Sequence, residues 1–105
     1  MAKPKKMKIF VKVDDNGMVT VTWRGGSKSA PKNVVTFTSN RRDTAIKFIT
    51  SPIAECRSRQ VMKLKNAQGP FLVTHPGIHQ IQCGHVVAGI FKQWALAGED
   101  IPIPC

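Results

Sequence analysis

Two stretches of alternating apolar and polar residues flank the dipeptide Asn16-Gly17, and this pattern restricts the fold more than any other. Asn-Gly favours a two-residue hairpin turn because both residues tolerate a positive φ angle. Alternation with a period of two is typical of a strand with one buried face. We therefore predict an antiparallel hairpin over residues 7–24. Its core face would carry Ile9, Val11, Val13, Val19, Val21 and Trp23.

The opposite face of this hairpin combines one aromatic ring with cations and hydroxyl groups. Its residues are Lys8, Phe10, Lys12, Thr20, Thr22 and Arg24. Proteins that bind single-stranded nucleic acid use such faces, with bases stacked on the ring and cations contacting phosphates. The alternative is that a helix covers this face and that Phe10 belongs to the core. The sequence leaves both alternatives open.

The residues that follow the hairpin predict a third strand and then a helix. Residues 33–39 resemble a strand with Val35 and Phe37 facing the core, which would complete an antiparallel meander. Ser39 or Asn40 is a suitable N-cap for the helix that follows.

Proline and glycine divide the second half of the chain. Pro52 would break the first helix, and a second helix over residues 52–67 would stop at Gly69-Pro70. Two short strands around Pro76-Gly77 predict a second hairpin. Residues 85–98 carry apolar side chains at helical spacing and predict a C-terminal helix.

Together these elements predict an α+β fold in a single small domain. The order is an N-terminal three-stranded antiparallel meander, a broken helix pair, a second β-hairpin and a C-terminal helix. The domain would span residues 7–98, after a basic arm at 1–6 and before an irregular tail at 99–105 that contains two prolines.

The net charge indicates a polyanionic partner. The chain has 16 Lys and Arg against 6 Asp and Glu, a formal charge of +10. Between residues 16 and 98 only Asp43 and Glu55 are acidic. Nucleic acid is the commonest cytoplasmic polyanion. Beyond the hairpin, the candidate phosphate-binding residues are Lys28, Lys32, Arg41, Arg42, Arg59, Lys63 and Lys65.

The three histidines lie within twelve residues and raise the question of a metal or catalytic site. On one strand, His79 and Cys83 would be roughly 13 Å apart at about 3.3 Å per residue, too far to share a zinc ion. We therefore expect no metal and no cofactor. His75 and His79 flank a turn and are candidates for acid and base in RNA cleavage. The alternative is that one fills the turn and the other packs beside the core.

Three hypotheses for the function follow. The first is a small, non-enzymatic, basic nucleic-acid-binding protein that contacts mainly phosphates. The second is a protein-binding regulator or inhibitor that docks on an acidic partner. The third is a small ribonuclease that uses His75 and His79. The odd count of three cysteines, with no signal-peptide or membrane-span pattern, favours a cytoplasmic location. The sequence does not distinguish DNA from RNA, or one strand from two.

Overall fold

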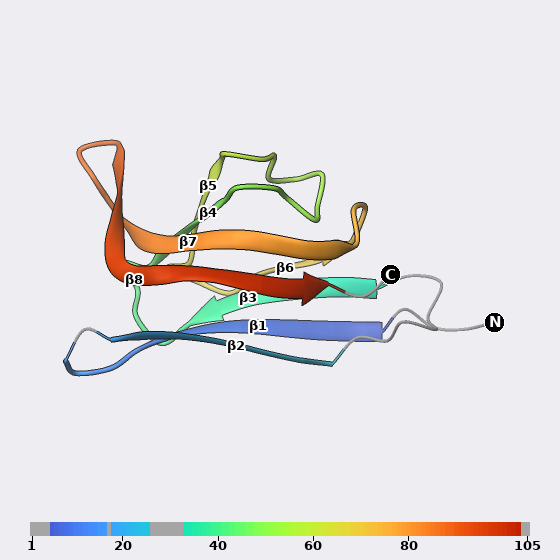
Figure 1. Cartoon of the computed structure of the whole chain (residues 1–105), viewed down its shortest axis with the longest axis horizontal. Helices are drawn as coiled ribbons and strands as arrows, with labels where there is room; N and C mark the ends of the chain where they lie inside the picture. Colours follow the sequence, from blue (N-terminus) through green and yellow to red (C-terminus); the bar gives the residue numbers. More distant parts are fainter. Residues whose placement is uncertain (1–4, 17, 26–32, 104–105) are drawn as a thin grey trace.

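The computed structural model describes residues 5–16, 18–25 and 33–103, which form eight strands and no helix. Two four-stranded sheets face each other, sheet A in the order β2-β1-β3-β6 and sheet B in the order β5-β4-β7-β8 (Figure 1). The predicted α+β class is therefore wrong. The strands are β1 Lys5–Val13, β2 Val19–Gly25, β3 Asn33–Ser39, β4 Ala45–Phe48, β5 Val61–Lys63, β6 Gln68–Leu72, β7 Gly77–Val87 and β8 Ile90–Ile103.

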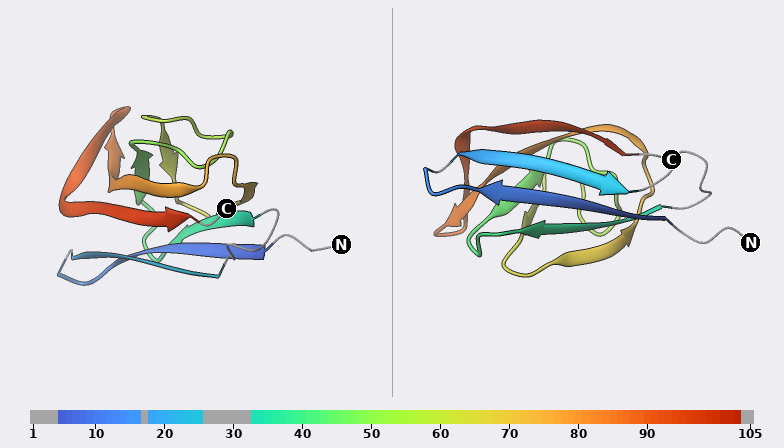
Figure 2. Two further views of the ribbon diagram at one scale, coloured as in Figure 1. Left: turned by 45° about the vertical axis from the view of Figure 1, so that its right-hand side comes forward. Right: turned by 90° about the horizontal axis from the view of Figure 1, so that it is seen from below.

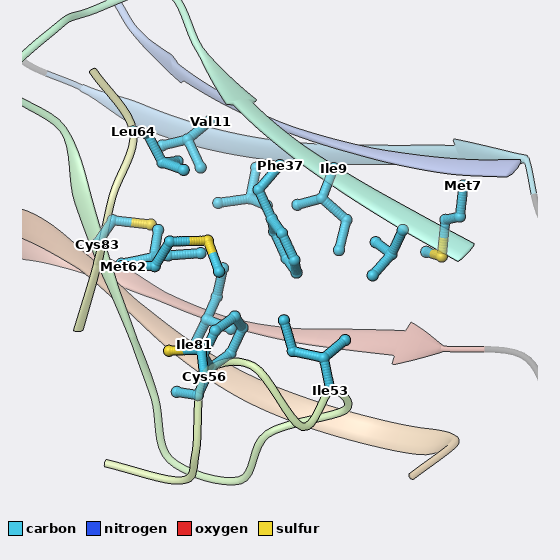
Figure 3. Close-up of a cluster of buried hydrophobic side chains, with 14 residues drawn as sticks. Met7, Ile9, Val11, Phe37, Ile53, Cys56, Met62, Leu64, Ile81 and Cys83 are labelled. Atoms are coloured by element: carbon cyan, nitrogen blue, oxygen red, sulfur yellow. The ribbon is translucent and has the colours of Figure 1, made fainter. Parts of the chain in front are cut away.

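Apolar side chains from the inner faces of both sheets form one buried cluster (Figure 3). Phe37 on β3 and Phe48 on β4 meet edge to face, with ring centroids 5.4 Å apart and an interplanar angle of 67°. Such a pair contributes about 0.5–1.5 kcal/mol beyond the burial of its area. The other buried members are Met7, Ile9, Val11, Val21, Val35, Ile46, Ile53, Cys56, Met62, Leu64, Ile81 and Cys83.

The predicted N-terminal hairpin is confirmed, because β1 pairs antiparallel with β2 as far as Val13 and Val19. Four of the six predicted core residues are buried and Val19 is half-buried, while Trp23 keeps 38% of its surface exposed. The Asp14 carboxylate accepts hydrogen bonds from the backbone N–H groups of Asn16 and Met18 in the loop. Gly17 lies outside the described residues.

The predicted antiparallel meander is wrong, because β3 lies beside β1 and runs parallel to it. β6 pairs antiparallel with the other side of β3. This central position explains the complete burial of Val35 and Phe37, whose inward orientation was predicted correctly. Asn40 continues the ladder beyond β3: its amide oxygen accepts the Val13 N–H at 2.8 Å, and its amide nitrogen donates to the Val13 carbonyl at 2.9 Å.

The broken helix pair is replaced by strands and loops. The segment Ala45–Phe48 forms β4, which pairs antiparallel with both β5 and β7. Ala45, Ile46 and Phe48 are buried there, and Lys47 is half-buried. Residues 49–60 form a loop organised by Ser51, whose hydroxyl contacts the carbonyls of Ile53 and Cys56. Ser51 thus orders a turn, as its hydroxyl chemistry allows, but no helix follows it.

The predicted second hairpin is also wrong, because β6 belongs to sheet A and β7 to sheet B. The segment around Pro76-Gly77 therefore passes from one sheet to the other. β7 pairs instead with β8, so the residues of the predicted C-terminal helix form a hairpin. Its turn residues, Ala88 and Gly89, both have positive φ angles, 51° and 78°, as in the primed turns of two-residue hairpins.

The limits of the predicted arm and tail also change. Lys5 and Lys6, expected in the basic arm, begin β1. Residues 99–103, expected to be irregular, complete β8 and pair with β7 from Ile81 back to Gly77. Residues 1–4, 104 and 105 lie outside the described part of the chain.

The β7–β8 hairpin bends sharply near its middle, and the end of the hairpin that carries the turn between β7 and β8 points away from sheet A (Figure 1). The register shifts between the pairs Gln82–Gly98 and Gly84–Gln93, so β8 carries the extra residues. The two backbones approach closely at Gly84: a Cβ atom there would lie 2.0 Å from the Lys92 carbonyl oxygen. Only glycine fits at this position.

We expect Gly84→Ala to lower the free energy of unfolding by about 1–3 kcal/mol, the usual cost of overpacking. The added methyl group meets backbone, which cannot rotate away as a side chain could. Urea denaturation followed by circular dichroism measures the change. The control is Gln82→Ala, on the same face two residues earlier, which should alter stability by less than about 0.5 kcal/mol. Equal stability of Gly84→Ala and the wild type would contradict the close approach.

Candidate nucleic-acid interface

One side of sheet A is open. Sheet B covers its inner side (Figure 1), and the view from below shows β2, β1, β3 and β6 with no other described segment in front of them (Figure 2). The helix-covered alternative for Phe10 is therefore wrong for the described part of the chain. We call this open side the outer face of sheet A. Its residues on the three strands around β1 are Lys6, Lys8, Phe10, Lys12, Thr20, Thr22, Arg24, Val34, Thr36 and Thr38.

Phe10 lies at the centre of this face. In the strand register, Thr22 on β2 and Thr38 on β3 flank it on either side. The ring is half-buried and borders a shallow hollow of about 400 Å³. The hollow is lined by Lys8, Phe10, Thr22, Trp23, Arg24 and Thr38. An apolar floor with hydroxyl groups at its sides suits a flat, polar-edged group such as a nucleobase.

Exposed cations stand on both sides of Phe10 along β1. Lys8 and Lys12 are each two residues away, which is about 7 Å at roughly 3.3 Å per residue. Arg24 lies directly opposite Lys8 on β2. None of the described side chains of this face is acidic, and Asp14 lies beyond the face in the hairpin loop. The outer face of sheet A is therefore electropositive.

Four residues of this face, Lys6, Val34, Thr36 and Thr38, were not assigned to it by the sequence analysis. Thr36 lies opposite Lys8, and Thr38 lies opposite Phe10, because β3 pairs with β1. The inward orientation of Val35 and Phe37 already implied that both threonines point outward. The sequence did not reveal that β3 lies beside β1.

Arg41, a predicted phosphate contact, is occupied by neighbouring protein groups. Its Nε atom lies 2.6 Å from a carboxylate oxygen of Asp43, and its guanidinium lies 5.3 Å from the ring centroid of Trp94. Trp94 in turn stacks with His85 at a centroid distance of 5.7 Å. This arrangement ties the turn after β3 to the bend of β8. Arg42, in the same turn, is exposed.

The remaining basic candidates do not share the outer face of sheet A. Lys63 lies in β5 of sheet B, and Arg59 and Lys65 flank that strand. With Arg57 they form a second exposed basic region, which we call the β5 region. Arg59 and Lys63 fall within the predicted second helix over residues 52–67, which is wrong because the structure has a loop and β5 there. Lys28 and Lys32 lie outside the described residues.

The two candidate catalytic histidines have different environments. His79 is buried, with 7% of its surface exposed, and its Nε2 atom contacts the backbone carbonyl of His75 rather than its ring. Its Nδ1 atom lies 3.0 Å from the Thr50 hydroxyl. The same Nδ1 atom also lies 3.1 Å from the Thr50 carbonyl oxygen, so both ring nitrogens have protein partners. His75 is exposed and contacts Thr74. Neither nitrogen of His79 is free for a substrate.

No three His, Cys, Asp or Glu side chains of the described residues lie close enough together to hold a metal ion. Cys56 and Cys83 are buried in the core, and burial raises the pKa of the Cys56 thiol. Its thiol is therefore less reactive than an exposed one. Cys105 lies outside the described residues.

Comparison of the chain with family models, curated proteins and solved structures finds no match. The described part of the chain contains no helix with the length and apolar character that a membrane crossing requires.

We expect His79→Ala to destabilise the protein by about 1–3 kcal/mol, because the His75 carbonyl and Thr50 would lose their buried partner. His75→Ala, which removes only an exposed ring, should change stability by less than about 0.5 kcal/mol. Urea denaturation measures both. The contrary result is that the protein cleaves RNA and that each substitution abolishes cleavage while the fold is retained. A purely structural role of His79 would not explain that result, and the ribonuclease hypothesis would be correct.

Proposed function

We propose that this protein is a small, non-enzymatic nucleic-acid-binding protein and that it binds through the outer face of sheet A. The observation that carries the proposal is an open sheet face on which exposed Lys8, Lys12 and Arg24 surround a half-buried Phe10. Cations there would contact phosphates, and the threonine hydroxyls can donate to phosphate oxygens as well. Binding of this kind depends on charge and shape rather than on base sequence.

The aromatic centre favours nucleic acid over an acidic protein partner. A surface that only attracts carboxylates needs no ring among its cations, whereas nucleic acid offers both phosphates and flat bases. The charge of the whole chain supports either partner equally. The distinction therefore depends on Phe10 and its hollow.

The β5 region is the less suitable of the two basic surfaces. Its cations lie on a three-residue edge strand and in the adjoining loops, with exposed Glu55 nearby in the sequence. Half-buried Phe71 borders a hollow of about 780 Å³ beside Lys63, but acidic Glu55 lines the same hollow. The β5 region provides a matched control, because it carries the same type of charge on the other sheet.

We expect binding to random-sequence DNA and RNA to weaken steeply with salt, with a log–log slope of about −3 to −5 for roughly four to six phosphate contacts. Lys8→Ala and Arg24→Ala should each make the slope shallower by about one. Arg59→Ala and Lys63→Ala should leave it unchanged. Fluorescence anisotropy with labelled oligonucleotides at several salt concentrations measures these slopes.

Two results would contradict the proposal. If the wild type binds no nucleic acid at low salt, the protein-partner hypothesis becomes the better one. If the β5 variants weaken binding and the sheet A variants do not, the interface lies on the β5 region.

A further inference from the structure

We propose that the ligand of the outer face of sheet A is a single strand, with one base stacked on Phe10 and the adjacent phosphates on Lys8 and Lys12. This inference rests on the proposed function and specifies its substrate class. It follows from three features of the face: where its ring lies, how its cations are spaced, and where its charge changes sign.

The position of the ring selects an unpaired base. Phe10 is half-buried in its hollow, between the strands that carry Thr22 and Thr38. To stack on it, a base must present its flat face to the sheet. A base inside a duplex has both faces covered by its neighbours, and its exposure costs unpairing and unstacking. A single strand presents its bases without that cost. A duplex would meet the cations alone.

The spacing of the cations matches a strand that follows β1. Lys8 and Lys12 point to the same side as Phe10, one before it and one after it, and each is about 7 Å away along the strand. The two lysines are therefore roughly 13 Å apart along the strand, and their long, flexible side chains can each reach toward a phosphate on one side of the stacked base. Arg24 strengthens the Lys8 end, because it lies opposite Lys8 on the neighbouring strand.

The charge changes sign beyond Lys12. The hairpin loop that follows β1 carries exposed Asp14 and Asp15. Their carboxylates would repel phosphates, so the loop marks one end of the binding site. The footprint is thus short. Phe10 is the single aromatic residue among the described outward positions of β1, β2 and β3, and Trp23, which is 38% exposed, also borders its hollow.

The face has little means of reading the base that it stacks. Asn, Gln, Asp and Glu, which recognise adenine and cytosine edges, are absent from its described side chains on these strands. Lys8 and Arg24 are of the types that can recognise guanine, but in the proposed complex they contact phosphates. Hydroxyl groups such as those of Thr22 and Thr38 both donate and accept hydrogen bonds, so they fit any base edge. We therefore infer binding that is selective for single strands but tolerant of sequence.

The test compares Phe10→Leu with the wild type, using a ten-nucleotide oligothymidine and a ten-base-pair duplex at the same low salt. Leucine keeps an apolar side chain of similar reach and removes the ring face, so the fold is retained, which circular dichroism verifies. We expect single-strand affinity to fall by roughly 5- to 150-fold, the loss for one stacked base. Duplex affinity should change less than about twofold, since phosphate contacts are untouched.

A substitution and a matched control sharpen the result. Phe10→Trp keeps an aromatic ring at this position and should therefore keep single-strand binding. The tryptophan fluorescence that this variant has in excess of the wild type should be quenched when oligothymidine binds. Phe91→Leu alters a half-buried ring on the β7–β8 hairpin, away from sheet A, and should not change affinity.

The outcomes separate this inference from the proposed function. Equal losses for the single strand and the duplex, or no loss for either, would overturn stacking on Phe10 and leave nucleic-acid binding intact. A wild type that binds the duplex more tightly would likewise overturn it. A wild type that binds neither ligand would overturn both.

Discussion

The packing of Phe37 against Phe48 across the two sheets is the contact on which the remaining structure depends. It fixes which face of each sheet is buried, and the alternation of strand residues then fixes what each sheet presents to solvent. On β1 the described inward side chains, Met7, Ile9, Val11 and Val13, are all apolar, whereas the outward positions are free of packing demands. The candidate interface exists because the core needs only one face of sheet A.

The predictions from sequence were correct where the apolar pattern fits only a strand. They were wrong where the same apolar spacing fits both a helix and a hairpin. The β1–β2 hairpin was predictable because strict alternation surrounds a turn dipeptide. Val86, Val87, Ile90 and Phe91 have the spacing of a helical face, yet the same spacing arises when residues pair across a two-residue turn, as Val87 and Ile90 do. The β-branched residues near this turn were the only local sign of strands.

The candidate site was predictable only as far as local pairing extends. Phe10, its lysines and Arg24 belong to one hairpin, so their common face followed from the alternation. Thr38 joined them through parallel pairing of β3 with β1, which no local signal specifies. The contacts of Arg41 were predictable only in part, because Asp43 is two residues away whereas Trp94 is far away in the sequence.

The parallel pairing of β1 and β3 also affects the nascent chain. The hairpin of β1 and β2 is complete before β3 has been synthesised, so the backbone of β1 initially has an unpaired edge on the side that β3 later covers. Exposed edges of this kind promote pairing between chains, and lysines are a common defence against it. Lys6, Lys8 and Lys12 lie on β1, and positive charge at these positions disfavours the pairing of two such hairpins before β3 takes its place.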